Sequence, residues 1–455
     1  MSRKSVQRFC DNDMRKTKDL KRGTRFRSPQ GRKNSMTRTA KLTIIPPRKP
    51  LSGRAMPPGS KSITNRALLL AGPAKGTSRL TGALKSDDTR YMADALRAMG
   101  VAIDEPDDTT FVVTGNGRLL PPEAPLFLGN AGTATRFLTA AAALVDGTVI
   151  VDGDEHMRKR PIGPLVEAMR TLGIDVTAET GCPPVTVKGT GRFQADRIRI
   201  DGGLSSQYVS ALLMMAAGGD RPVDIELVGE DIGALGYIDL TTAAMKAFGA
   251  KVEKTSPVTW RVAPTGYRAA DFIVEPDASA ATYLWAAEVL TGGAIDLGVP
   301  SDTFSQPDAR AYDIIAKFPH LPAEIDGSQM QDAVPTLAVL AAFNETPVRF
   351  VGIANLRVKE CDRIRALSTG LNRIVSGLAR EEGDDLIVQS DPALAGRRLS
   401  AEIDSFADHR IAMSFALAGL KIDGITILDP DCVGKTFPAY WRTLAALGVK
   451  YQHND

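Results

Sequence analysis

The sequence has few of the residues that build disulfide frameworks and metal clusters. It contains only four cysteines and four histidines among 455 residues, and they are scattered rather than grouped at C-x-x-C spacing. Zinc sites and disulfide scaffolds need ligands that recur at short, regular intervals, so both classes are disfavoured. We expect reduced thiols and a cytoplasmic location.

Long hydrophobic runs are also missing. No apolar stretch approaches the 18 or more residues that a membrane-spanning helix needs, and "ALLMMAAGG" and "LTAAAALV" are too short. We therefore expect no membrane partner. A composition of 43% hydrophobic and 24% charged residues is ordinary for a globular protein. Because 455 residues exceed what one core usually supports, we expect two or more domains.

Negative charge is scarce at the start of the chain. Residues 1–35 contain 12 Lys or Arg and three Asp, a surplus of +9, so the net +3 of the chain leaves about −6 elsewhere. Without apolar periodicity, residues 1–40 are predicted to be a disordered basic leader. The leader could reflect an upstream start codon before Met36, which we favour, an organelle (for example plastid) transit peptide, or a nucleic-acid arm. Because this basic charge is confined to the leader, it is no evidence that the rest of the chain binds nucleic acid.

One unit recurs along the chain. "ALRAMGVAIDE", "AMRTLGIDVTAE" and "AMKAFGAKVEK" each end a helix at a glycine and then begin a strand, and these glycines (Gly100, Gly173 and Gly249) are 73 and 76 residues apart. Similar stretches surround Gly377 and Gly448. Such spacing predicts a βα-rich unit used several times in two domains that meet near residue 275. Helix–glycine–strand joints common to all α/β proteins remain the alternative.

Seven motifs place cations and small polar residues at predicted helix starts. They are "GSKSITNR", "LGNAGTATRF", "MRKRPIG", "GGLSSQYVSALL", "NLRVKECDRI", "FADHRIAMSFAL" and "DPDCVGKTFPAYW". The first is no P-loop, because Ser60 separates Gly59 from Lys61 and the upstream glycine is missing. Each motif alone is typical of a solvated face or a cap, with Pro161 expected as a first helical residue. Together they predict helix N-termini that converge on one anion-binding cleft.

In this order, from about residue 42 to 448, the motifs resemble those of the 5-enolpyruvylshikimate-3-phosphate (EPSP) synthase family of enolpyruvyl transferases. The resemblance implies an α/β fold, a two-domain inside-out α/β barrel in which each domain has pseudo-threefold βαβαββ repeats. We expect a first domain at 60–275, inserted into a second domain made of 41–59 and 276–455. The resemblance also implies a monomer without a metal or other cofactor.

Members of this family transfer the enolpyruvyl group of phosphoenolpyruvate to the 5-hydroxyl of shikimate 3-phosphate and release phosphate, in the shikimate pathway of chorismate and aromatic amino acid biosynthesis. Both substrates are phosphorylated carboxylates, which accounts for the many cations. The reaction needs a base for the hydroxyl proton and an acid for the enol methylene carbon. The resemblance implies Asp332 as the base, Glu360 as the proton donor, and Lys61 as a catalytic cation between the substrates.

The resemblance also assigns two sets of binding residues. The set for shikimate 3-phosphate is Lys61, Ser62, Arg66, Ser205, Ser206, Gln207, Tyr237, Asp332, Asn355 and Lys359. The set for phosphoenolpyruvate is Lys61, Gly132, Arg160, Gln207, Arg363, Arg410 and Lys435. Members are inhibited by glyphosate, which occupies the phosphoenolpyruvate site, and Gly132 is expected to leave room for it.

Three residues depart from the family pattern. Phe137 replaces a proline that often follows the arginine of the glycine turn, Ala234 stands where many members have a phosphate-binding serine, and Leu356 replaces a common aromatic residue. We expect these changes to affect affinity and not the reaction.

Two other functions remain open. The sister enzyme that acts on UDP-N-acetylglucosamine usually carries a reactive cysteine on a loop of the first domain, but Cys182 lacks basic sequence neighbours. A polyanion-binding scaffold that uses the basic leader predicts salt-dependent nucleic-acid binding and no phosphate release.

Overall fold

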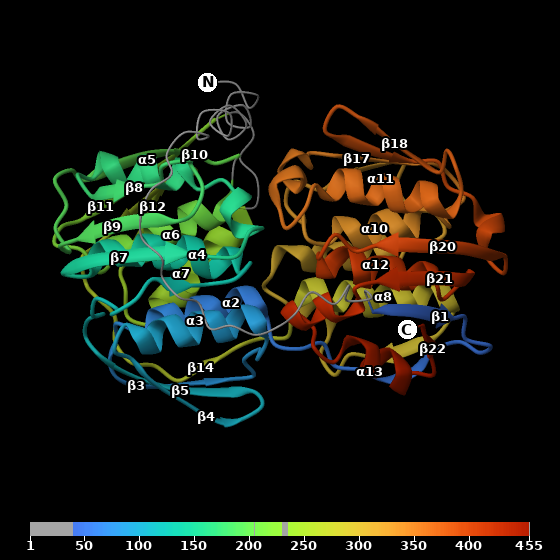
Figure 1. The fold of residues 1–455 in the computed structure, drawn as a ribbon, viewed down its shortest axis with the longest axis horizontal. Coiled ribbons are helices and arrows are strands. Elements are labelled where there is room, and N and C mark those ends of the chain that lie inside the picture. The colour runs from blue at the N-terminus through green and yellow to red at the C-terminus, as the bar shows by residue number, and fades with distance from the viewer. Residues whose placement is uncertain (1–39, 204, 230–234, 455) are drawn as a thin grey trace, which may run out of the picture.

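The computed structural model describes residues 40–203, 205–229 and 235–454. The predicted leader, apart from its last residue, and Ala234 lie outside these residues. The described chain forms two lobes side by side (Figure 1). We call residues 60–275 the first half, and residues 41–59 with 276–454 the second half. Each half has its own cluster of buried hydrophobic side chains.

The first half contains three four-stranded sheets with one topology. In each sheet the first and second strands in spatial order are parallel. The second and third strands are antiparallel, and so are the third and fourth. The sheets, in spatial order, are β14 (Phe272–Ile273), β3 (Lys75–Thr81), β5 (Thr110–Asn116) and β4 (Ala102–Asp107); β6 (Leu126–Phe127), β7 (Gly147–Asp152), β9 (Val185–Gly189) and β8 (Asp175–Thr177); and β10 (Arg197–Asp201), β11 (Val223–Val228), β13 (Thr259–Val262) and β12 (Val252–Ser256).

The second half repeats this topology twice and keeps only the parallel pair of the third copy. Strand β1, at the start of the described chain, pairs with the last strand and so completes one of these sheets. In spatial order the sheets are β16 (Glu324–Asp326), β17 (Val348–Val351), β19 (Asp385–Val388) and β18 (Ala379–Glu382); β20 (Arg398–Asp404), β21 (Asp423–Leu428), β1 (Lys41–Ile45) and β22 (Lys450–Asn454); and β15 (Ala294–Asp296) with β2 (Ser52–Arg54).

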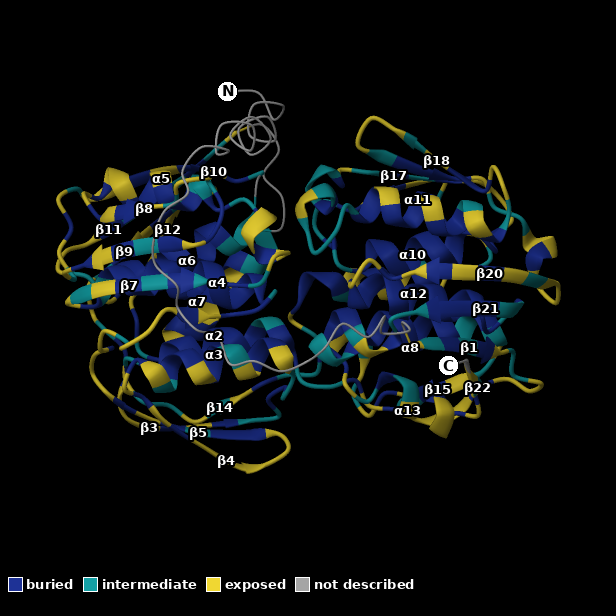
Figure 2. Cartoon of the chain, viewed as in Figure 1, coloured by how far each residue is buried: buried dark blue, intermediate teal, exposed yellow. Residues whose placement is uncertain are grey.

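Six inner helices occupy the middle of the two lobes. They are α2 (Lys61–Ala71), α4 (Gly132–Ala141), α6 (Ser206–Ala216), α8 (Ala278–Thr291), α10 (Val334–Ala341) and α12 (His409–Ala418). Every residue of α4, α10 and α12 is buried, and Figure 2 shows these helices in dark blue. Helices that are buried on every side lie in the interior of a fold. The predicted inside-out architecture is confirmed, although no sheet of the described chain closes into a barrel.

The other helices lie nearer the surface, and five of them end as the repeat predicted. They are α3 (Asp87–Ala98), α5 (Gly163–Thr171), α7 (Leu235–Ala247), α9 (Ala311–Ile315), α11 (Arg363–Ile374) and α13 (Tyr440–Ala446). All but α9 are followed by one of the five repeat glycines, whose φ values lie between 80° and 109°. Left-handed backbone favours glycine, so the repeat is structural. Pro161 was expected to open a helix, but α5 begins at Gly163 and has Pro164 in its first turn.

The chain crosses between the halves twice, at one place. Gly59 pairs with Pro276, Ser60 N–H donates to Glu275 O at 2.9 Å, and Asp277 N–H donates to Pro58 O at 2.7 Å. Short 3-10 helices complete the described chain: η2 (Ala142–Leu144), η3 (Met157–Lys159), η4 (Ser301–Thr303), η5 (Pro307–Arg310), η6 (Ala354–Val358), η7 (Pro392–Leu394) and η8 (Pro430–Lys435). Among the described residues, no helix has the length and apolarity to cross a membrane.

Candidate active site

One small cavity gathers residues from the starts of the inner helices of both halves. Its volume is about 40 Å³. Nine of the ten residues that the resemblance assigned to shikimate 3-phosphate line it, together with Thr133 and Gln331: Lys61, Ser62, Arg66, Ser205, Ser206, Gln207, Tyr237, Asp332 and Lys359. The tenth, Asn355, lies in η6 outside the lining, and its buried Oδ1 has no hydrogen-bond partner in the described structure.

Hydroxyl groups cap two of these helix starts. The Ser205 Oγ accepts a hydrogen bond from the Gln207 N–H at 3.2 Å, and the Ser60 Oγ accepts one from the Ile63 N–H at 3.4 Å. Lys61 and Ser206 are therefore the first residues of α2 and α6. Backbone N–H groups at a helix start are partly positive, so these positions favour anions.

Arg66 is a buried cation without a carboxylate partner among its hydrogen bonds. Its guanidinium donates to Thr241 Oγ1 at 2.8 Å, Ser62 O at 2.8 Å, Ser210 Oγ at 3.1 Å and Tyr237 O at 3.4 Å. Burial lowers its pKa to about 10. The ring of Phe137 lies 5.2 Å from the guanidinium carbon, so this departure from the family pattern packs against a proposed substrate ligand.

The second half supplies a network of alternating charges. The Arg363 guanidinium donates to Asp332 at 3.0 Å, to Glu360 at 2.7 Å and to Asp408 at 2.7 Å. Arg410 donates to the other oxygen of Asp332 at 2.7 Å. Burial opposes ionisation of Asp332, but the charges of Arg410, Lys359 and Arg363 outweigh it and keep the pKa of Asp332 well below its usual range.

Glu360 joins the two halves. Its Oε1 accepts from Lys435 Nζ at 3.0 Å and lies 3.8 Å from an Arg160 nitrogen, and the same Lys435 Nζ donates to Asn130 O of the first half at 2.8 Å. Burial opposes ionisation here too, but Lys435, Arg363 and Arg160 together hold the pKa of Glu360 well below its usual range. Glu360 is therefore ionised while the site is empty.

Lys61 and Lys359, unlike Lys435, are only weakly paired. Lys61 Nζ lies 3.8 Å from Asp88 Oδ2, and Lys359 Nζ donates to Gln331 Oε1 at 3.4 Å. Burial lowers the pKa of Lys359 and raises that of Asp88. Positive charge is thus available where the cavity opens.

Gly132 lies against two guanidinium groups. A Cβ atom at this position would be 2.6 Å from Arg136 Nη1 and 2.8 Å from Arg160 Nη2. Arg136 also donates to Gly132 O at 2.9 Å, and its pKa falls to about 10 because of burial and the nearby charge of Arg160. The absence of a side chain at Gly132 therefore lets Arg160 approach the turn.

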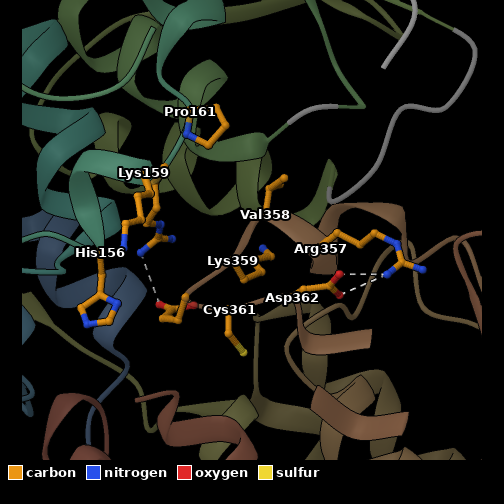
Figure 3. A pocket seen from close by; sticks show the side chains of 10 residues that line it. His156, Lys159, Pro161, Arg357, Val358, Lys359, Cys361 and Asp362 are labelled. Atoms are coloured by element: carbon orange, nitrogen blue, oxygen red, sulfur yellow. Dashed lines mark hydrogen bonds and ion pairs between the residues drawn. The ribbon is translucent and has the colours of Figure 1, made fainter. Parts of the chain in front are cut away.

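A second, larger cavity of about 180 Å³ lies between the halves. Figure 3 shows His156 and Lys159 of the first half on one side, and Arg357 and Asp362 of the second half on the other. Arg160, Lys359 and Glu360 also line it, so it borders the ion-pair network. Most of its charged lining is cationic, as expected for a path that anions follow.

Several acidic residues at the site carry no role in the sequence-based assignment. Asp408 caps α12 and binds Arg363, Asp88 faces Lys61 and Lys435, and Asp308 lies buried beneath Tyr237. Asp408 belongs to a quoted motif, so its cap position was a usable signal. Asp88 and Asp308 lie in ordinary surroundings in the sequence, and only the fold brings them to the site.

Comparison with known proteins identifies the family of the chain. The sequence matches the family "EPSP synthase (3-phosphoshikimate 1-carboxyvinyltransferase)" over residues 45–318 and 308–444. A protein named 3-phosphoshikimate 1-carboxyvinyltransferase from Rhizobium leguminosarum bv. trifolii (strain WSM2304) is 94% identical over 420 residues, 92% of this chain and 100% of that protein. Another of that name, from Pseudomonas savastanoi pv. phaseolicola (strain 1448A / Race 6), is 69% identical over 413 residues, 91% of this chain and 99% of that protein.

Solved structures show the same architecture. EPSP synthase from Acinetobacter baumannii is similar with a TM-score of 0.74 at 25% identity, over 92% of this chain and 100% of that chain. The enolpyruvyl transferase NikO from Streptomyces tendae shares the fold with a TM-score of 0.67 at 19% identity, over 92% of this chain and 99% of that one. This chain belongs to the EPSP synthase family.

Proposed function

We propose that this protein transfers the enolpyruvyl group of phosphoenolpyruvate to the 5-hydroxyl of shikimate 3-phosphate and releases phosphate. Family membership supports this activity. The observation that supports it in the structure is the meeting of two buried carboxylates, Asp332 and Glu360, with cations of both halves. Two phosphorylated carboxylic acids need such cations, and the proton transfers need the carboxylates.

Shikimate 3-phosphate binds at the small cavity where the two halves meet. Its phosphate contacts Ser205, Ser206 and Gln207 at the start of α6, where backbone N–H groups favour anions. Arg66 supports this placement, because a buried guanidinium without a carboxylate partner gains one from an acidic substrate. Asp332 and Lys359 line the same cavity and reach the hydroxyl groups of the ring.

Phosphoenolpyruvate binds where Arg160, Arg363, Arg410 and Lys435 converge. In the empty site these cations are bound to Asp332 and Glu360, so the substrate competes with two protein carboxylates for them. A third anion close to Glu360 raises the pKa of that carboxyl. Glu360 therefore gains a proton as phosphoenolpyruvate binds, which gives an acid where the empty site has a carboxylate.

The reaction then moves protons between the two carboxyls and the substrates. Asp332 takes the proton of the 5-hydroxyl, whose oxygen bonds to C2 of phosphoenolpyruvate, while Glu360 gives its proton to the methylene carbon. In the second step a proton returns from that carbon to Glu360, the double bond re-forms, and the bond from C2 to the phosphate oxygen breaks. The proton held by Asp332 passes to the leaving phosphate, which restores the Asp332 carboxylate. Lys61 lies at the junction and offsets the negative charge in both steps.

We also propose that the two halves are domains that close on the substrates about the paired crossing near residues 59 and 275. The contacts of Lys435 with Asn130 and of Leu235 with Gln329 are formed only when the halves approach. Small-angle scattering should show a smaller radius of gyration when shikimate 3-phosphate and glyphosate are added. An unchanged radius would contradict closure. The same experiment tests the proposal that the protein is a monomer, since it reports the particle mass; the proposed cytoplasmic location is tested by cell fractionation.

Steady-state phosphate release tests the proposed function. We expect release that requires both phosphoenolpyruvate and shikimate 3-phosphate, and inhibition by glyphosate that competes with phosphoenolpyruvate. UDP-N-acetylglucosamine should not replace shikimate 3-phosphate, because Cys182 is only 2% exposed and cannot serve as a mobile reactive thiol. Phosphate release with phosphoenolpyruvate and UDP-N-acetylglucosamine, but not with shikimate 3-phosphate, would favour the sister reaction. No release with either acceptor would refute both proposed activities.

A further inference from the structure

Asp308 is a buried carboxylate that no step above uses. It lies in η5 and has 0% exposure. Its two oxygens have different partners: Oδ1 accepts from the Ala333 N–H at 3.0 Å, and Oδ2 accepts from the Tyr237 hydroxyl. A buried carboxylate with two specific donors is held in one orientation.

These two partners connect Asp308 to the proposed site from opposite sides. Ala333 directly follows Asp332, so its hydrogen bond fixes the backbone beside the proposed base. Tyr237 belongs to α7 of the first half and lines the small cavity, whereas Asp308 belongs to the second half. The bond between Tyr237 and Asp308 therefore requires that the two halves be together.

The charges of Asp308 and Asp332 also act on each other. Burial, and then the charge of Asp332, raise the pKa of Asp308 to about 6, against the hydrogen bond from Tyr237 and the charge of Arg410. The same repulsion works in reverse, so an ionised Asp308 makes Asp332 a stronger base than its cations alone would leave it. The charge of Asp277, the cap of α8, also raises the pKa of Asp308.

We propose that Asp308 is a positioning residue for proton transfer at Asp332, which it serves by orienting the Asp332 backbone through Ala333 and by placing a second negative charge near the Asp332 carboxylate. Tyr237 of the first half keeps Asp308 in place, so this set of hydrogen bonds is complete only when the halves have closed. The proton of the 5-hydroxyl still goes to Asp332, and Asp308 touches no reacting atom. This inference rests on the proposed function.

The first test is Asp308→Asn, measured as kcat against pH with both substrates saturating. Asparagine keeps an oxygen for the Ala333 N–H and removes the charge, while its NH2 group faces the Tyr237 hydroxyl, which must then accept instead of donate. We expect kcat at pH 8 to fall by about tenfold, the effect of about one pKa unit on the strength of a base. In the wild type kcat should fall below pH 6 as Asp308 gains a proton, and this acid limb should be weaker in the variant. Substrate phosphates titrate near the same pH, so the variant is compared with the wild type under identical conditions.

A matched control is Asp313→Asn, the same change at an exposed position on the neighbouring helix α9. It should keep the wild-type kcat and the wild-type acid limb. Tyr237→Phe provides a second, independent signature. It removes the hydrogen bond that favours the ionised Asp308, so the acid limb should move to higher pH, whatever happens to the affinity for shikimate 3-phosphate.

The outcomes separate this inference from the proposed function. If the wild type releases no phosphate, the proposed function fails. If the wild type is active but Asp308→Asn retains both its kcat and its acid limb, the positioning role is wrong. A lower kcat with an unchanged acid limb would also overturn it, because loss of structure alone lowers kcat without altering the pH profile. If the acid limb of the Tyr237→Phe variant stays at the wild-type pH, the hydrogen bond from Tyr237 of the first half does not favour the ionised Asp308 as proposed.

Discussion

Buried arginines in the two halves are stabilised in opposite ways. In the first half, Arg66 and Arg136 donate to backbone carbonyls and hydroxyls, and burial lowers the pKa of each to about 10. In the second half, Arg363 and Arg410 donate to carboxylates, whose charges overcome burial and raise the arginine pKa values. Arg66 and Arg136 are therefore short of negative charge until an anion binds, whereas Arg363 and Arg410 are already neutralised.

This difference indicates that the two halves respond differently when an anion binds. An anion that enters the first half relieves a cost of burial, so this half is suited to bind substrate. An anion that enters the second half must displace Asp332 and Glu360 from their cations, so binding there changes the protonation of the groups that move protons. We therefore propose that binding of the shikimate 3-phosphate anion relies mainly on the first half, whereas phosphoenolpyruvate binding and proton transfer rely mainly on the second.

The largest expected effect is on stability and compares the two kinds of arginine. Arg363→Met leaves the buried Asp408 and Glu360 without a principal counter-charge, and loss of one partner from a buried ion pair costs about 3–5 kcal/mol. Arg66 donates no hydrogen bond to a carboxylate of the described residues, so Arg66→Met leaves no buried carboxylate there without its partner. We expect it to lower the free energy of unfolding distinctly less. Chemical denaturation of both variants measures the difference. Equal losses would mean that the arginine environments do not differ as described.

Lys61→Met should come next, with a loss of several hundredfold in kcat. Lys61 lines the cavity beside Asp332 and Lys359, and it is the cation closest to the junction of the two substrates in our proposal. Removing one preorganised stabilising donor typically costs about 10²–10³ in rate. Lys75→Met, an exposed lysine on β3, is the control for loss of charge. A variant of Lys61 with kcat within threefold of the wild type would exclude a catalytic role.

Glu360→Gln should lower kcat by about a hundredfold without raising the Michaelis constants, because a neutral side chain no longer competes with phosphoenolpyruvate for the cations. The substitution removes the proton donor but keeps the volume and the surrounding cations. Steady-state kinetics in both substrates give the comparison. A raised Michaelis constant for phosphoenolpyruvate at unchanged kcat would assign Glu360 to binding and place the acid elsewhere.

Gly132→Ala should have a smaller effect, about tenfold on the ratio of the glyphosate inhibition constant to the phosphoenolpyruvate Michaelis constant. The new methyl group would meet Arg136 and Arg160, whose shift narrows the space for the longer ligand more than for the substrate. Some loss of phosphoenolpyruvate affinity is expected as well, since Arg160 is a proposed ligand. Phe137→Pro, measured in parallel, shows whether the ring that packs on Arg66 also affects this turn. A ratio that does not change in Gly132→Ala would remove Gly132 from the glyphosate site.

Sequence reasoning reached the fold and most of the site for identifiable reasons. The repeat glycines were visible because left-handed backbone needs glycine at a fixed place in each unit. Several of the proposed binding residues could be predicted because they stand at helix starts, where motif and structure coincide. Asp308 was not, because its partners Tyr237 and Ala333 are distant in sequence and belong to different halves. The ionisation of Glu360 also depends on such contacts, since Lys435 and Arg160 come from separate segments.

Proton uptake on ligand binding tests the central claim that the second half changes its protonation when an anion enters. Isothermal titration of glyphosate into the complex with shikimate 3-phosphate, in buffers of different ionisation enthalpy, counts the protons bound. We expect the wild type to take up a larger part of a proton than Glu360→Gln does, because the ligand competes for the cations that keep Glu360 ionised. Titration of shikimate 3-phosphate alone should show no such difference between the two proteins. Equal proton uptake by wild type and Glu360→Gln on glyphosate binding would contradict the account.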